Sequence, residues 1–226
     1  MADTDLIISM IDHAVLAPDA TRDDVLAGCE LVAELRTASI CVHPRWVPTA
    51  VEALKDSPVP VGTVAGFPLG ATTGEAKALE ARQAVSRGAD EIDMVLAITS
   101  LKSGDYDAVL DDIAGVVGAA YMANIDEPTV KVILETCYLT EAEIYTAVAL
   151  AVEAGADFVK TSTGFGPEGA TVENVRLLRE AAPDEVGVKA AGGIRGVEDC
   201  VAMIDAGATR IGTSSTREIA EELGVS

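Results

Sequence analysis

Short apolar runs alternate with longer amphipathic stretches along the whole chain, at a spacing of roughly 25 to 35 residues punctuated by Gly, Pro and Thr. The short runs predict strands at Met10–His13, Ser39–Val42, Val61–Ala65, Glu91–Val95, Val130–Glu135, Asp157–Lys160, Gly187–Ala190 and Thr209–Gly212. The longer stretches predict helices at Thr21–Thr37, Arg45–Lys55, Thr73–Arg87, Tyr106–Ala123, Glu141–Ala154, Val172–Ala181, Val197–Ala206 and Arg217–Leu223. Parallel strands joined by helical crossovers in this number favour one α/β architecture, a single (β/α)8 TIM barrel, over an open doubly wound sheet.

Length and composition agree with one barrel. A chain of 226 residues is normal for this architecture, and no linker rich in Pro, Gly or Ser divides it, so residues 1–226 are expected to form one domain. The chain is 49% hydrophobic and only 4% aromatic, with Ala, Val and Ile supplying most of the apolar content. Such a composition suits parallel strands that are covered by helices.

The formal net charge of −21 restricts the partners of this protein. Nucleic acids and anionic membrane surfaces bind clustered Lys and Arg, so neither is expected as a partner. Disorder is excluded for most of the chain by its high hydrophobicity. Our hypothesis for the acidic surface is a halophilic source with a high-salt cytoplasm, where ions screen self-repulsion.

The cysteines and the N-terminus point to the reducing interior of a cell. Cys29, Cys41, Cys137 and Cys200 are far apart without metal-ligand spacing, which predicts reduced core thiols, no disulfide framework and no metal site. The first residues lack a basic region followed by an apolar run, and no stretch approaches 18 apolar residues. We therefore expect a soluble protein of the cytoplasm with no membrane partner.

Charged residues end several of the predicted strands. Asp93 closes DEID, Glu135 closes VKVILE, Lys160 closes DFVK and Lys189 closes VGVK. In a barrel of this kind the chemistry lies at the carboxyl ends of the strands, and buried charges there are costly unless they are paired or functional. These residues are therefore the candidates for a site.

The two strand-end lysines predict an activated amine. Lys160 and Lys189 are one βα unit apart, so they should lie on neighbouring strands at a similar height. Two ammonium groups roughly 5–6 Å apart repel by about 3 kcal/mol at an effective dielectric of 20, which lowers one pKa and favours Schiff-base chemistry. Asp93 opposes this effect, so we expect it to lie closer to one lysine. The alternative is a structural ion network of both lysines with Asp93 and Glu135.

The loops after these strands suggest a phosphorylated ligand. TSTGFGPEGAT, AAGGIRG and GTSS are rich in Gly, Ser and Thr, and backbone N–H groups in such loops bind anions ahead of a helix. Residues Gly164–Gly169 also spell the dinucleotide fingerprint G-x-G-x-x-G. That alternative is weaker because no acidic residue ends the next strand to bind a ribose hydroxyl.

Successive motifs resemble those of the deoxyribose-phosphate aldolase family from near residue 11 to near residue 216. They are IDHAVLAPDAT, SICVHPRWV, VGTVAGFPLGATT, GADEIDMVL, LKSGDY, VKVILETCYLT, GADFVKTSTGFGPEGAT, VGVKAAGGIR and GATRIGTSS. The resemblance implies reversible cleavage of 2-deoxy-D-ribose 5-phosphate into D-glyceraldehyde 3-phosphate and acetaldehyde by a class I mechanism, without metal or cofactor. The implied partners are thus a phosphorylated sugar and small aldehydes.

The resemblance also assigns roles to residues. Lys160 matches the family's Schiff-base lysine. Lys189 matches the lysine that lowers the pKa of the Schiff-base lysine and helps in proton transfer. Asp93 matches the aspartate that moves protons during the reaction. The matching phosphate-binding residues are Gly164, Gly192, Gly193, Gly212, Ser214 and Ser215, with Arg195 nearby as a further contributor. The chain departs from common family residues at Ala14, Ala17, His43, Ala97 and Ala191, which puts substrate range and phosphate affinity in question.

Other functions remain open from the residues alone. One is another phosphosugar barrel enzyme, either an isomerase or a transaldolase-like aldolase. A second is a barrel that binds a phosphate ligand without catalysis, because a fold does not guarantee turnover. We also expect a homo-oligomer, a dimer or larger, since barrels of this size often associate.

Overall fold

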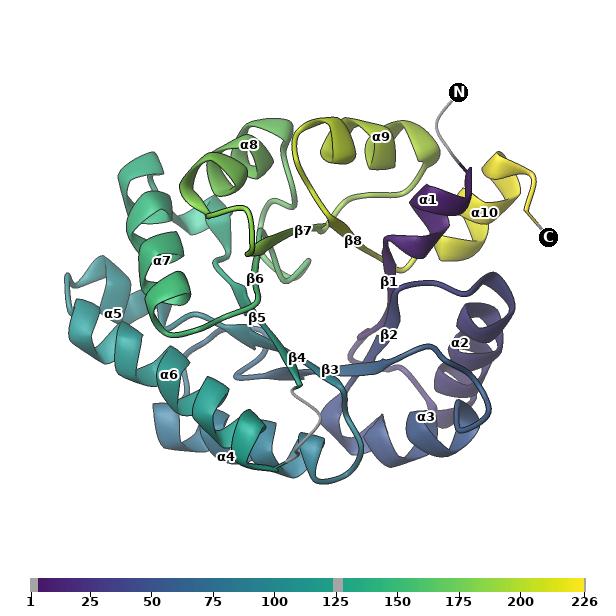
Figure 1. Cartoon of the computed structure of the whole chain (residues 1–226), viewed down its shortest axis with the longest axis horizontal. Coiled ribbons are helices and arrows are strands. Elements are labelled where there is room, and N and C mark those ends of the chain that lie inside the picture. Colours follow the sequence, from purple (N-terminus) through teal and green to yellow (C-terminus); the bar gives the residue numbers. More distant parts are fainter. Residues whose placement is uncertain (1–3, 124–127, 226) are drawn as a thin grey trace.

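The computed structural model describes residues 4–123 and 128–225. Its strands are all parallel and pair in sequence order from β1 to β8, and β1 pairs with β8 to close a barrel (Figure 1). The strands are β1 Ile11–Val15, β2 Ser39–Val42, β3 Val61–Ala65, β4 Glu91–Val95, β5 Thr129–Ile133, β6 Phe158–Lys160, β7 Gly187–Ala191 and β8 Arg210–Thr213. The predicted (β/α)8 TIM barrel is confirmed.

Helices form the outer layer of the barrel (Figure 1). They are α1 Thr4–Ser9, α2 Arg22–Leu35, α3 Val47–Ala53, α4 Gly74–Val85, α5 Ile98–Lys102, α6 Tyr106–Ala123, α7 Glu141–Glu153, α8 Val172–Ala181, α9 Val197–Asp205 and α10 Thr216–Leu223, with 3-10 turns η1 Pro44–Trp46 and η2 Thr136–Tyr138. Capping boxes at Thr21 and Thr140 satisfy backbone donors at the starts of α2 and α7. Within the described ranges, no helix is long and apolar enough to cross a membrane.

Most predicted elements are present, and several have the predicted bounds. The bounds of β2, β3, β4, α6 and α8 are confirmed. The predicted end of the fifth strand at Glu135 is wrong, because β5 stops at Ile133 and Glu135 takes a left-handed conformation with φ of 55°. The short elements α1, α5, η1 and η2 were not predicted. They are too short to show a period in the sequence.

The barrel wall separates an apolar layer from a charged interior. Val, Ile, Leu and Ala side chains of the strands and helices form the main core between sheet and helices. Inside the ring, the register places Lys160 on β6 opposite Lys189 on β7, and Asp93 on β4 opposite Lys131 on β5. The predicted placement of the two strand-end lysines on neighbouring strands at one height is therefore confirmed.

Candidate active site

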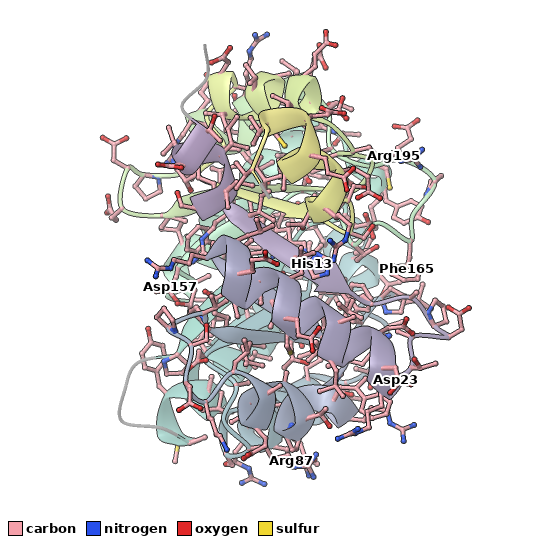
Figure 2. The ribbon with its side chains drawn as sticks, turned by 90° about the vertical axis from the view of Figure 1, so that its right-hand side faces the viewer. His13, Asp23, Arg87, Asp157, Phe165 and Arg195 are labelled. Atoms are coloured by element: carbon pink, nitrogen blue, oxygen red, sulfur yellow. The ribbon has the colours of Figure 1, made fainter. Side chains whose placement is uncertain are left out.

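A cavity of about 820 Å³ opens at the carboxyl ends of the strands. Lys160 and Lys189 lie at its floor, and its wall includes all the residues predicted to bind phosphate: Gly164, Gly192, Gly193, Arg195, Gly212, Ser214 and Ser215. Figure 2 shows Arg195 and Phe165 at one edge of the molecule, with Asp157, which directly precedes β6, at the opposite edge. The structure thus brings the two predicted groups of site residues together around one space.

Asp93 joins the two lysines below this cavity. The Nζ atoms of Lys160 and Lys189 donate to the same Oδ2 of Asp93, at 2.7 and 2.8 Å. All three side chains are buried. Burial opposes the charge on Asp93, but Lys131, Lys160 and Lys189 outweigh it and hold the pKa of Asp93 well below its usual value. Asp93 is therefore a carboxylate at neutral pH.

Asp12 makes the two lysines unequal. The expectation that Asp93 lies closer to one lysine is wrong, because its two distances are nearly the same. The asymmetry comes from Asp12 on β1, whose Oδ2 lies 2.6 Å from the Nζ of Lys189.

The pKa values of the lysines shift in opposite directions as a result. Burial lowers the pKa of Lys160, Asp93 opposes that shift, and the charge of Lys189 adds to it, so the pKa lies below 10.5. Burial also acts to lower the pKa of Lys189, but Asp12 and Asp93 outweigh it, and the pKa is raised. A lysine with a lowered pKa beside a second, charged lysine is the arrangement that makes an amine nucleophilic.

Further charged residues deeper in the barrel were missed by sequence reasoning. Lys131 contacts Glu91 at 2.5 Å and Asp93 at 3.0 Å, and Arg210 contacts both Asp12 and Glu91. The available signal was a charged residue inside an apolar strand, as in I-D-H, V-K-V and R-I-G. The alternative of a structural ion network is thus correct for Asp93, which pairs with both lysines. The lysines also line a cavity, so the ion network is compatible with the interpretation of an activated amine.

Glu135 has a different role from the one considered in the sequence. It accepts hydrogen bonds from the backbone N–H of Thr163, at 3.2 Å, and from the hydroxyl of Thr163. Its conformation turns the chain after β5, and its carboxylate fixes the loop that follows β6. The idea that Glu135 pairs with a site lysine is wrong, because its carboxylate is used to hold Thr163 in the cavity wall.

The glycine-rich loops predicted to bind an anion contain residues with positive φ. Gly192 and Gly193 both have positive φ, 89° and 83°, in the left-handed region that favours glycine. A Cβ on Gly212 would lie 3.1 Å from the Cε of Lys189. Arg217, in the first turn of α10, also lines the cavity, and sequence reasoning missed it.

Part of the cavity lining is apolar. Ala14, Leu16 and Cys41 line the cavity. Behind them, Val64 and Phe67 belong to the same small hydrophobic cluster. Burial and the charge of Asp93 raise the pKa of Cys41 to about 11, so the thiol stays protonated at neutral pH. The cavity lining therefore combines the residues predicted to bind phosphate with apolar side chains.

No protein side chains in the described part of the chain are arranged as a metal site. Residues 4–123 and 128–225 contain no group of three or more His, Cys, Asp or Glu side chains able to hold an ion. The four cysteines are free thiols; Cys29, Cys41 and Cys200 are buried, whereas Cys137 is partly exposed and is not a core residue.

Comparison with known proteins identifies the family. The model of the DeoC/LacD family aldolases matches residues 6–222. The chain belongs to this family of aldolases. As a DeoC/LacD family member, it is 54% identical over 216 residues to the deoxyribose-phosphate aldolase of Caldanaerobacter subterraneus subsp. tengcongensis, covering 96% of this chain and 93% of that protein.

Solved structures give the same assignment for this DeoC/LacD family member. A putative deoxyribose-phosphate aldolase from Coccidioides immitis superimposes with a TM-score of 0.93 at 40% identity, covering 99% of this chain and 87% of that one. The deoxyribose phosphate aldolase of Aeropyrum pernix, described as tetrameric, superimposes with a TM-score of 0.91 at 32% identity, covering 99% and 93%.

Proposed function

We propose that this chain is a deoxyribose-phosphate aldolase that reversibly cleaves 2-deoxy-D-ribose 5-phosphate to D-glyceraldehyde 3-phosphate and acetaldehyde. The observation that carries the proposal is the Lys160 amine, whose pKa is lowered at the floor of a cavity beside a charged Lys189. Membership of an aldolase family and the names of its curated relatives support the same reaction.

Lys160 is the proposed nucleophile. Its neutral amine adds to the aldehyde carbon of the open-chain sugar, and loss of water from the carbinolamine gives an imine. The protonated imine withdraws electrons from the bond between the second and third carbons. That bond breaks as the third-carbon hydroxyl loses its proton, which releases glyceraldehyde 3-phosphate and leaves a two-carbon enamine. Protonation and hydrolysis of the enamine release acetaldehyde and restore the amine.

Asp93 and Lys189 are the proposed proton carriers. Asp93 holds both lysine nitrogens on one oxygen, so it can accept a proton as the carbinolamine forms and return it as water leaves. The charged Lys189 is a donor on the same side of the cavity. Because the imine itself is the electron sink, the proposed reaction needs no cofactor and no metal.

The substrate phosphate is proposed to bind on the loops after β6, β7 and β8. The predicted residues Gly164, Gly192, Gly193, Gly212, Ser214 and Ser215 supply N–H and hydroxyl donors around one wall of the cavity. Arg195 and Arg217 add positive charge at its mouth. Holding the phosphate there places the aldehyde end of the sugar at the lysines, which is the positioning that accelerates imine formation.

Reductive trapping tests this proposal. Incubation with acetaldehyde and borohydride should add a two-carbon group to Lys160, located by peptide mass mapping, and a coupled assay should detect glyceraldehyde 3-phosphate release. Lys160→Arg should lose the adduct and at least about a thousandfold in kcat. Full activity in that variant would overturn the proposal. Cleavage without an adduct would indicate a different cleavage mechanism. Isomerisation without an adduct would indicate the isomerase alternative. Binding of a phosphate ester without turnover would indicate a barrel that binds a phosphate ligand without catalysis.

The assembly and the compartment are proposed on separate grounds. A homo-oligomer is supported by the tetrameric Aeropyrum pernix relative, and light scattering of the purified chain tests it. A cytoplasmic site of action is supported by the free thiols of the four cysteines, which are typical of a reducing compartment. Cell fractionation followed by the aldolase assay tests the compartment.

A further inference from the structure

The barrel interior contains a connected set of buried ionisable groups, which we name the interior charge cluster. Its carboxylates are Asp12, Glu91 and Asp93, and its basic groups are Lys131, Lys160, Lys189 and Arg210. The cluster extends from Arg210 and Glu91, at the amino ends of their strands, up to the floor of the cavity. Six of its members are almost fully buried, and the side chain of Arg210 is 20% exposed.

The basic groups outnumber the carboxylates by one. If all of them were charged, the cluster would hold one uncompensated positive charge inside a closed ring of strands. An uncompensated buried charge costs several kcal/mol, so the stable arrangement has one basic group without its proton. Arginine does not lose its proton in proteins, which leaves the three lysines as candidates.

The carboxylates are shared unequally among these lysines. Lys131 contacts all of them, at 2.5 Å from Glu91, 3.0 Å from Asp93 and 3.6 Å from Asp12. Lys189 contacts both Asp12 and Asp93. Within the described residues, Lys160 is paired with Asp93 alone. The proton therefore leaves Lys160 most easily.

We propose that Arg210 and Glu91, which lie away from the reacting atoms at the foot of the barrel, set the number of protons held by the interior charge cluster and thereby keep the Lys160 amine uncharged. The inference rests on the proposed function of Lys160 as nucleophile. Arg210 forms ion pairs with Asp12 and Glu91, so the negative charges of these carboxylates do not compensate a positive charge on Lys160. Arg210 and Glu91 act through Asp12, Lys131 and Asp93, which makes them positioning residues and not catalytic ones.

The other ionisable groups near Lys160 do not alter this balance at neutral pH. On β2, Cys41 is a neutral thiol because its pKa is raised to about 11 by burial and by Asp93. On β1, burial lowers the pKa of His13 to about 4, so its ring is neutral. Glu135, after β5, accepts hydrogen bonds from Thr163, and among the described residues it forms no ion pair with a lysine of the cluster. The remaining charged groups of the cavity lie at its mouth: Asp19, Asp24, Arg195, Arg217 and Glu218.

Arg210→Met tests the proposal, because it removes one cation while an unbranched side chain remains over the ring of Phe158. With carboxylates and basic groups then equal in number, Lys160 should keep its proton to higher pH. We expect a rise of about one unit in the half-maximal pH, which is the pH where the rate of acetaldehyde imine formation reaches half its maximum. Below that pH the rate should be about tenfold lower than in wild type, because less of the amine is neutral. Arg210→Lys retains the charge and should keep the wild-type profile.

Glu91→Gln supplies the opposite change. It removes a carboxylate, so the half-maximal pH should move below the wild-type value. The double variant Glu91→Gln/Arg210→Met again has one basic group in excess, and its profile should return to within a few tenths of a unit of wild type. Arg87→Met is the matched control for net charge, since Arg87 is exposed at the periphery of the molecule (Figure 2) and should shift nothing.

A purely structural role predicts a different pattern. Both single variants would then lose stability and maximal rate of imine formation, while the half-maximal pH stays unchanged. The double variant would be less stable and slower than either single variant. Shifts in the same direction for the two single variants, or no compensation in the double variant, would overturn the proposal. Circular dichroism shows whether Arg210→Met folds. If it does not, the proposal is still tested by the half-maximal pH of Glu91→Gln and by the return of that pH toward the wild-type value in the double variant. If wild type forms no adduct on Lys160, the proposed function fails; if it does and the profiles do not move, only this inference fails.

Discussion

The Nζ of Lys189 lies 2.6 Å from the Oδ2 of Asp12, a residue from the opposite end of the chain. This contact distinguishes Lys189 from Lys160, because both lysines are otherwise bound to one oxygen of Asp93. It stabilises the charge on Lys189 and leaves Lys160 as the amine with the lowered pKa. The proposed choice of Lys160 as nucleophile thus depends on Asp12, a carboxylate that also lines the cavity.

Replacing that carboxylate should make the two lysines more alike. In Asp12→Asn the pKa of Lys189 should fall, because the carboxylate that most strongly stabilises its charge is gone. Acetaldehyde and borohydride should then label Lys189 in addition to Lys160, and kcat should fall by about ten- to a hundredfold. Peptide mass mapping measures the ratio of the two adducts. Asp12→Glu is the matched control and should keep the label on Lys160, whereas exclusive labelling of Lys160 in Asp12→Asn would contradict the prediction.

His13 should make stability depend on pH between about 4 and 6.5. Burial lowers its pKa from 6.5 to about 4, Glu218 opposes that shift, and Arg217 adds to it; its Nδ1 also lies 2.8 Å from the Thr216 hydroxyl. The unfolded chain binds the proton first as pH falls, so this contribution is complete above pH 6.5 and is lost toward pH 4.

Urea unfolding at pH 7.5 and 4.5 measures the effect. The free energy of unfolding of wild type should fall by about 2–3 kcal/mol more between these pH values than that of His13→Gln. The carboxylates titrate in both proteins, so the difference isolates the histidine. Equal losses in the two proteins would show that His13 does not carry this dependence.

Arg217 should matter only for phosphorylated substrates. Arg217→Met should raise KM for 2-deoxyribose 5-phosphate by about tenfold, because a charged hydrogen bond to the phosphate is lost. The value of kcat/KM for unphosphorylated 2-deoxyribose should not change. Arg87→Met serves as the control for net charge. An equal loss with both sugars would assign Arg217 to the structure of α10 and not to phosphate binding.

High salt should stabilise the protein. The net charge of −21 creates self-repulsion that is screened when the Debye length falls to about 3 Å at 1 M salt. The Tm should rise by about 5 °C or more between 50 mM and 1 M KCl. Potassium chloride is preferred over a sulfate salt, which would stabilise apolar burial on its own. An unchanged Tm would remove the basis for the halophilic hypothesis.

The sequence predicts those features that depend on local pattern. The strands β2, β3 and β4 are apolar runs bounded by turn residues, so their bounds can be located from the period of the side chains. The neighbouring positions of Lys160 and Lys189 follow from the regular succession of strands around a barrel.

Features that depend on contacts across the ring were not predicted. The end of β5 was placed too late because the turn at Glu135 is fixed by Thr163, which follows a different strand. The pairing of Asp12 with Lys189 forms only when the first strand closes the ring against the eighth. Arg217 is the first residue of the last predicted helix, and only the closed barrel brings the start of that helix to the cavity.

The lysines lie on strands, whereas most of the proposed phosphate-binding residues lie in the loops that follow the strands. This separation has a practical consequence for laboratory evolution. Libraries confined to 164–169, 192–196 and 213–218 would vary the cavity wall that carries the proposed phosphate-binding residues. The residues that lower the pKa of the Lys160 amine would stay unchanged on β1, β4, β5, β6, β7 and β8. Selection for new aldehydes can therefore proceed without rebuilding the reactive nitrogen.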